Sequence, residues 1–136
     1  YESHKAKNFI DNDKVCINFW WPNIEVQVRI EGTISKCEEK FSDEHFQGRK
    51  PEKNVAALVS EQSKKIESYD LLKQKYEAMK ERIENGDYSH SRPDNWGGYQ
   101  IKVHFFEFWE ANDDRLNYRE CYEKDNESWS KYFLQS

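Results

Sequence analysis

Apolar and polar residues alternate strictly from Ile24 to Glu31, and this pattern constrains the fold more than any other feature of the chain. Apolar side chains occupy every second position as far as Ile30, and charged or amide side chains fill the positions between them. A period of two is typical of an antiparallel strand with one face buried. The pattern continues past Gly32, so we predict a long strand over residues 24–35.

Similar patterns predict the other strands and helices. Pro22 separates the long strand from an earlier alternation over residues 15–21. Alternation restarts at Tyr99, Ile101 and Val103, and three final strands are predicted over 105–109, 115–122 and 128–134. Serines followed by helix-forming residues predict helices beginning at Ser3, Ser42 and Ser68, and a short apolar helix or turn is predicted over 55–59. The first two helices would end at Asn12 and Gly48, and a polar loop is predicted over 87–95.

The helix beginning at Ser68 is predicted to run to Asn85 and to stop at Gly86. It carries one apolar stripe, formed by Leu72, Tyr76, Met79 and Ile83. Such a helix packs on one side only. The predicted fold class is therefore mainly antiparallel β with helices (α+β), with one long docked helix.

Composition narrows the classes of function. The chain has 136 residues, which fits one domain, and its 21 Trp, Tyr and Phe residues must supply much of the packing area. No apolar run approaches the roughly 20 residues of a membrane helix. The 21 basic and 26 acidic residues are interspersed, which argues against a nucleic-acid partner. Three widely spaced cysteines predict neither a disulfide framework nor a metal site, and favour a reducing, cytoplasmic compartment.

Several separate motifs, in order along the chain, carry a family resemblance. They are Gln27–Gly32, Phe46-x-x-Arg49, Val59–Ser63, Arg92–Tyr99, Glu107-Phe108-Trp109 and Arg115–Arg119. Together they resemble the pyridoxine (pyridoxamine) 5′-phosphate oxidase family over essentially all 136 residues.

The resemblance implies a Greek-key, FMN-binding split β-barrel and a homodimer whose two FMN sites are built from both subunits. The implied reaction is oxidation of pyridoxamine or pyridoxine 5′-phosphate at C4′ to pyridoxal 5′-phosphate. Hydride passes to the flavin and O2 reoxidises it, giving peroxide. Residues 1–136 are then a single family-like domain. The chain begins at Tyr1, without Met and without the family's first strands, so we expect a fragment or a processed chain.

The resemblance also implies six cofactor-binding residues: Lys5, Gln27, Gln62, Ser63, Trp96 and Arg119. Lys5, Gln62 and Ser63 match positions that meet the FMN phosphate and ribityl chain, with His4 in place of the family's arginine beside Lys5. Gln27 and Arg119 match residues at the flavin ring, and Trp96 matches a loop over its edge. From the residues alone, the polar members of this set are equally well explained as solvated surface side chains, and the Trp96-Gly97-Gly98 turn needs its glycines for backbone geometry.

The implied substrate site departs from the family pattern. The family holds the substrate phosphate with Tyr, Arg and Ser; here those positions are His45, Arg49 and Lys53. The family's Arg-Leu-His motif at the pyridine ring reads Arg115, Leu116 and Asn117, of which Arg115 and Asn117 are the catalytic candidates. Asn117 can hydrogen-bond but cannot titrate. A catalytically impaired member that binds flavin or pyridoxal phosphate is therefore an alternative, and a scaffold without flavin is a third reading.

Overall fold

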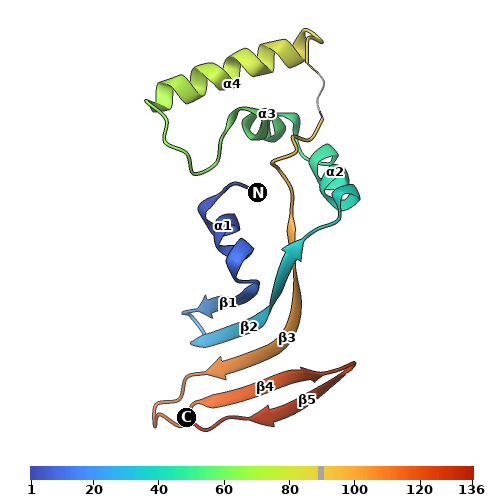
Figure 1. Cartoon of the computed structure of the whole chain (residues 1–136). Helices are drawn as coiled ribbons and strands as arrows, with labels where there is room; N and C mark the ends of the chain where they lie inside the picture. The colour runs from blue at the N-terminus through green and yellow to red at the C-terminus, as the bar shows by residue number, and fades with distance from the viewer. Residues whose placement is uncertain (89–90) are drawn as a thin grey trace. The chain divides into compact units, whose positions relative to one another are not determined.

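The computed structural model describes residues 1–88 and 91–136, and the chain divides into two compact units (Figure 1). The helical unit comprises residues 1–11 and 36–99, and the sheet unit comprises residues 12–35 and 100–136. The helices are α1 (His4–Asp11), α2 (Glu39–Gln47), α3 (Pro51–Val59) and α4 (Tyr69–Glu84). The strands are β1 (Lys14–Trp21), β2 (Val26–Lys36), β3 (Tyr99–Glu110), β4 (Tyr118–Asp125) and β5 (Ser128–Phe133).

The five strands form one antiparallel sheet in the order β1-β2-β3-β4-β5. In the first hairpin Ile17 lies opposite Ile30, and Trp21 lies opposite Val26. This arrangement confirms the predicted α+β class. The strand order follows the sequence, so the Greek-key crossover implied by the resemblance is not seen among the described strands.

Two predicted strand boundaries were wrong, both at turns. Strand β2 begins at Val26 because residues 22–25 are used to reverse the chain, and Glu25 has a left-handed φ of 51°. Strand β4 begins at Tyr118, after a turn in which the Arg115 N–H donates to the Asn112 carbonyl at 2.9 Å. The alternation that restarts at Tyr99 and the strand predicted over 105–109 belong to the single strand β3.

Two of the three predicted serine caps are confirmed. The Ser3 hydroxyl accepts from the Ala6 N–H at 3.3 Å, and the Ser68 hydroxyl accepts from the Leu71 N–H at 3.1 Å. The cap at Ser42 was wrong, because α2 begins at Glu39 and Ser42 lies buried inside the helix. Its hydroxyl instead accepts a tertiary hydrogen bond from the Gly98 N–H at 3.3 Å.

Helices α3 and α4 pack against each other within the helical unit (Figure 1). The stripe from Leu72 to Ile83 is half-buried, and the Tyr76 hydroxyl donates to the Glu52 carbonyl at 3.3 Å. This confirms one-sided packing of the long helix. Helix α3 begins at Pro51 rather than Val55, since proline suits the first turn of a helix. Residues 89–90 of the predicted 87–95 loop lie outside the described residues. No described helix has the length and apolar character needed to cross a membrane.

Candidate functional site

In the helical unit, Trp96 is the centre of an aromatic and cationic cluster. The His45 ring stacks on the Trp96 ring with centroids 6.0 Å apart and planes 10° apart, and the Phe46 ring meets it edge-on at 5.2 Å. The Arg49 guanidinium lies over the same indole, 4.8 Å from its centroid. His45 lies in the last turn of α2, and Arg49 follows Gly48, the residue that caps this helix. We call Trp96, His45, Arg49 and Phe46 the Trp96 cluster.

Arg49 has an unused donor. Its Nη2 donates to the Lys53 carbonyl at 3.1 Å, whereas its Nη1 is buried and has no hydrogen-bond partner among the described residues. A buried unpaired charged donor is costly, and an anionic ligand would satisfy it. The contact of Lys53 with Arg49 is made by its main-chain carbonyl, and the Lys53 side chain is exposed.

Gln62 lies with Trp96 on the wall of a small cavity of about 90 Å³. Tyr1 also lines it, and the Tyr1 ammonium donates to the Asn95 carbonyl at 2.7 Å. A Cβ added at Gly97 would lie 1.9 Å from the Tyr1 hydroxyl, so any other residue there would require the Tyr1 side chain to shift. The glycine after Trp96 therefore lets the Tyr1 ring approach the main chain closely.

Ser63 and Lys5 lie elsewhere in the helical unit. Ser63 has a left-handed φ of 70° and accepts a long hydrogen bond from the His4 N–H at 3.5 Å. It lines a cavity of about 140 Å³ whose wall also carries Lys64, Lys65 and Lys75. Lys5 is exposed on α1. The donors around Ser63 suit an anionic group such as a phosphate.

In the sheet unit, Gln27 and Arg119 lie on the same face of the sheet. Gln27 lies opposite Trp20 in the β1–β2 pair, and Arg119 lies opposite Trp109 in the β3–β4 pair. Directly opposed residues share a face, and the Trp20 and Trp109 rings are 6.1 Å apart. We call this the Gln27–Arg119 face.

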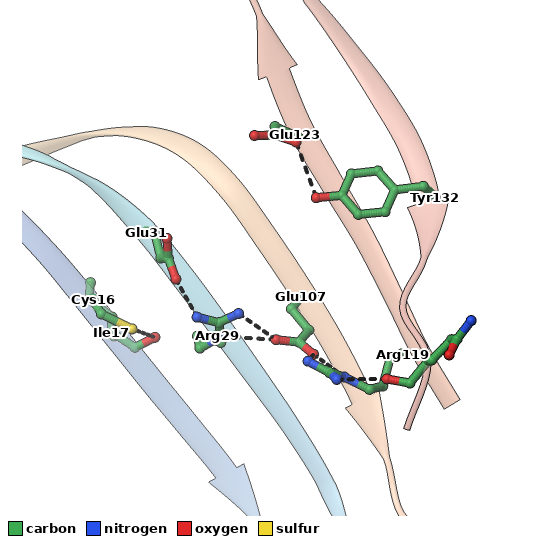
Figure 2. A network of polar contacts seen from close by, with 9 residues as sticks. Cys16, Ile17, Arg29, Glu31, Glu107, Arg119, Glu123 and Tyr132 are labelled. Carbon is green, nitrogen blue, oxygen red and sulfur yellow. Dashed lines mark hydrogen bonds and ion pairs between the residues drawn. The ribbon is translucent and has the colours of Figure 1, made fainter. Parts of the chain in front are cut away.

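Glu107 lies at the centre of this face and is only 3% exposed (Figure 2). Arg29 and Arg119 both donate to its carboxylate, at distances from 2.6 to 2.9 Å. Burial alone would raise the pKa of Glu107, but the hydrogen bonds and charges of the two arginines outweigh it and lower the pKa. Burial also disfavours the charged form of Arg29 and by itself would lower its pKa, but the contacts with Glu107 and Glu31 outweigh burial and raise the pKa. Glu107 is therefore held as a carboxylate.

Sequence reasoning assigned no role to Glu107. The available signal was its place between Phe105 and Trp109, where every second residue faces the buried side and a lone charge is unusual. Arg29 was equally unassigned. Both residues were quoted only as parts of motifs.

The other predicted residues of the sheet unit lie in the turn between β3 and β4. Arg115 has a left-handed φ of 64°, and Leu116 is 75% exposed. The Asn117 side-chain oxygen accepts from the Asn112 N–H at 3.1 Å, so Asn117 shapes its own turn. The structure thus groups His45, Arg49 and Trp96 in one unit, and Gln27 with Arg119 in the other.

Two family models together cover most of the chain. Residues 1–82 match the model described as pyridoxamine 5′-phosphate oxidase, and residues 96–136 match the model described as pyridoxine 5′-phosphate oxidase C-terminal dimerisation region. The chain belongs to the pyridoxamine 5′-phosphate oxidase family. FMN is the cofactor of this family, as the resemblance implied.

Relatives named pyridoxine/pyridoxamine 5′-phosphate oxidase agree with this assignment. The Colwellia psychrerythraea protein is 37% identical over 134 residues, which cover 98% of this chain and 61% of the relative. The Leptospira biflexa protein is 36% identical over 129 residues, covering 95% of this chain and 60% of the relative. The chain therefore spans about three fifths of the length of these oxidases.

Solved structures share the fold. PhzG from Burkholderia lata, in complex with tetrahydrophenazine-1-carboxylic acid, matches with a TM-score of 0.85 and 26% identity over 99% of this chain and 65% of PhzG. An FMN-binding, pyridoxamine 5′-phosphate oxidase-related protein from Nostoc punctiforme matches with a TM-score of 0.67 and 13% identity, covering 99% of this chain and 69% of its own, which bears on the fold alone. The split-barrel fold expected from the family is confirmed.

Proposed function

We propose that this protein is an FMN-dependent oxidase that converts pyridoxamine or pyridoxine 5′-phosphate to pyridoxal 5′-phosphate with O2, in vitamin B6 metabolism in the cytoplasm. The observation that carries the proposal is the match of residues 1–82 and 96–136 to the two oxidase family models. The relatives' printed names support the same substrate class.

The residues present fit FMN. Its phosphate and ribityl chain would be held by Ser63, Gln62 and Lys5. Lys65 and Lys75 on the wall of the Ser63 cavity add positive charge, whereas Lys64 is paired there with Glu61. Gln27 would hydrogen-bond the flavin ring and Trp96 would cover its edge. Bound FMN supplies the hydride acceptor that O2 reoxidises. Arg119 would place a cation where negative charge develops on reduction.

The substrate phosphate would meet the Trp96 cluster. The Nη1 of Arg49 is buried and has no hydrogen-bond partner in the described part of the chain, and the His45 and Lys53 side chains add two further donors. Arg115, Leu116 and Asn117 would bind and orient the pyridine ring. Asn117 cannot exchange a proton near neutral pH, so it would only position the ring.

The direct test is FMN binding followed by turnover. The purified protein is expected to be yellow, to quench the fluorescence of added FMN, and to consume O2 with pyridoxamine 5′-phosphate while pyridoxal 5′-phosphate and peroxide form in equal amounts. Boiled protein with free FMN is the control. A colourless protein that leaves FMN fluorescence unchanged would refute the proposal and favour a flavin-free scaffold.

The second candidate is a family member that binds FMN or pyridoxal phosphate without turnover. The hydrogen bond that ties the Asn117 side chain to its own turn favours it, because that oxygen is already engaged. FMN binding with no O2 consumption would establish this alternative. Tetrahydrophenazine-1-carboxylic acid, the molecule in the PhzG complex, should be tried in parallel, since its preferential oxidation would change the substrate class.

We also propose a homodimer. Residues 96–136 match a region described as a dimerisation region, and Trp20 and Trp21 are about half exposed in this single chain. Large exposed aromatic surfaces favour association. Sedimentation at micromolar concentration is expected to give twice the chain mass. A stable monomer with FMN bound would contradict this expectation.

A further inference from the structure

Glu107 is a buried charge in the middle of β3, and the function proposed above gives it no part. Charged side chains are almost never fully buried without partners, because removing them from water is costly. A buried carboxylate at this position therefore calls for an explanation from its partners.

Each carboxylate oxygen of Glu107 is contacted by a different arginine (Figure 2). Oε1 accepts from Arg119 Nε and Nη2, both at 2.6 Å. Oε2 accepts from Arg29 Nε at 2.9 Å and from Arg29 Nη2 at 2.8 Å. Such two-nitrogen contacts fix the plane of a guanidinium as well as its position.

Arg119 is fixed by its third nitrogen too. Nη1 donates to the main-chain carbonyl of Gln135 at 2.9 Å. All three nitrogens of Arg119 are thus anchored, yet the side chain remains 27% exposed on the Gln27–Arg119 face. Among the residues that the structure describes, Glu107 is the carboxylate paired with Arg119, whereas Glu31 contacts Arg29.

We propose that Glu107 is a positioning residue that holds the Arg119 guanidinium in the orientation needed at the flavin ring. The inference rests on the proposed function, in which Arg119 meets FMN. Without the carboxylate, Arg29 and Arg119 would repel each other, and Arg119 would have to be ordered at the moment FMN binds. Preorganisation by Glu107 removes that cost.

The test compares Glu107→Gln with Glu31→Gln as a matched control. Both remove one carboxylate from the same network, but Glu31 does not touch Arg119. FMN affinity of the stripped protein is expected to fall about tenfold in Glu107→Gln, the loss typical of one charge-assisted contact, and to stay within about twofold in Glu31→Gln. The reduction potential of bound flavin is expected to fall in Glu107→Gln only, since a misplaced cation stabilises the reduced anion less.

A second variant keeps the inference testable if Glu107→Gln does not fold. Arg119→Lys keeps the positive charge but lacks the two guanidinium nitrogens that contact Glu107. It should therefore lower FMN affinity and the flavin reduction potential, as Glu107→Gln does. In the Arg119→Lys background, Glu107→Gln should then add no further loss of FMN affinity.

The outcomes separate the two proposals. Wild-type protein that binds FMN, with Glu107→Gln at wild-type affinity and potential, overturns the positioning role and leaves the proposed function standing. An Arg119→Lys variant with wild-type affinity and potential overturns it as well. Equal losses from Glu107→Gln with and without Arg119→Lys would show that Glu107 acts independently of Arg119. Wild-type protein that does not bind FMN overturns both proposals.

Discussion

Binding of pyridoxal 5′-phosphate is expected to weaken roughly ten- to a hundredfold when Arg49 is replaced by alanine, because a charge-assisted hydrogen bond to phosphate typically contributes about 1.5–3 kcal/mol. FMN affinity should barely change, since the two phosphates are proposed to occupy separate subsites. Equilibrium titration of both ligands on Arg49→Ala measures the two effects. Lys50→Ala is the matched control, because it removes an exposed positive charge from the neighbouring position.

His45 is expected to add a further hydrogen-bond donor to the same subsite, because its ring and the Arg49 guanidinium both lie against the Trp96 indole. Unchanged pyridoxal 5′-phosphate affinity in Arg49→Ala would make these residues ordinary surface side chains. A parallel loss of FMN affinity would instead show that Arg49 supports the Trp96 cluster as a whole, a role that Arg49→Lys would partly restore.

Local sequence patterns predicted a helix or strand correctly where a short-range interaction decides the structure. The alternation from Val26 to Ile30 predicted β2 because one face of that strand packs and the other meets polar partners. Ser68 predicted the start of α4 because a hydroxyl at that position satisfies a free N–H of the first turn. Local signals failed at Ser42, whose hydroxyl serves Gly98, 56 residues away.

The candidate site could be predicted only in part. The sequence predicted His45 and Arg49 around a short helix and its exit loop, and in the structure both side chains contact the Trp96 ring. Trp96 reaches these two residues only through the tertiary fold, because it lies 47 residues beyond Arg49 in the sequence. The roles assigned to all the predicted site residues stay predictions.

Buried polar groups were the hardest features to predict. Glu107 reads as an ordinary strand residue until its two arginines are known, and they come from strands far apart in the sequence. The resemblance marked Arg119 but gave no reason for its orientation. Only the three-dimensional pairing supplies that reason.

Replacing Gly32 with alanine is expected to destabilise the sheet unit by about 1–3 kcal/mol, the usual scale of overpacking a filled site. Gly32 is buried in β2, next to β3 in the sheet. A Cβ there would lie 2.6 Å from both the Ile101 Cγ2 and the Lys102 carbonyl oxygen. The latter is a backbone atom that cannot rotate away, so the two strands would have to separate.

Separation of these strands would also disturb the contact between Arg29 on β2 and Glu107 on β3, so FMN affinity should fall together with stability. Urea unfolding followed by tryptophan fluorescence measures the first effect, and FMN titration measures the second. Gly48→Ala is the control, because Gly48 has a φ of −75° and its added Cβ would meet nothing closer than 3.4 Å. It should change the free energy of unfolding by less than about 0.5 kcal/mol. If Gly32→Ala is as stable as Gly48→Ala, β2 and β3 can accommodate a methyl group at Gly32. The close approach of the two strands would then not be what holds Arg29 against Glu107.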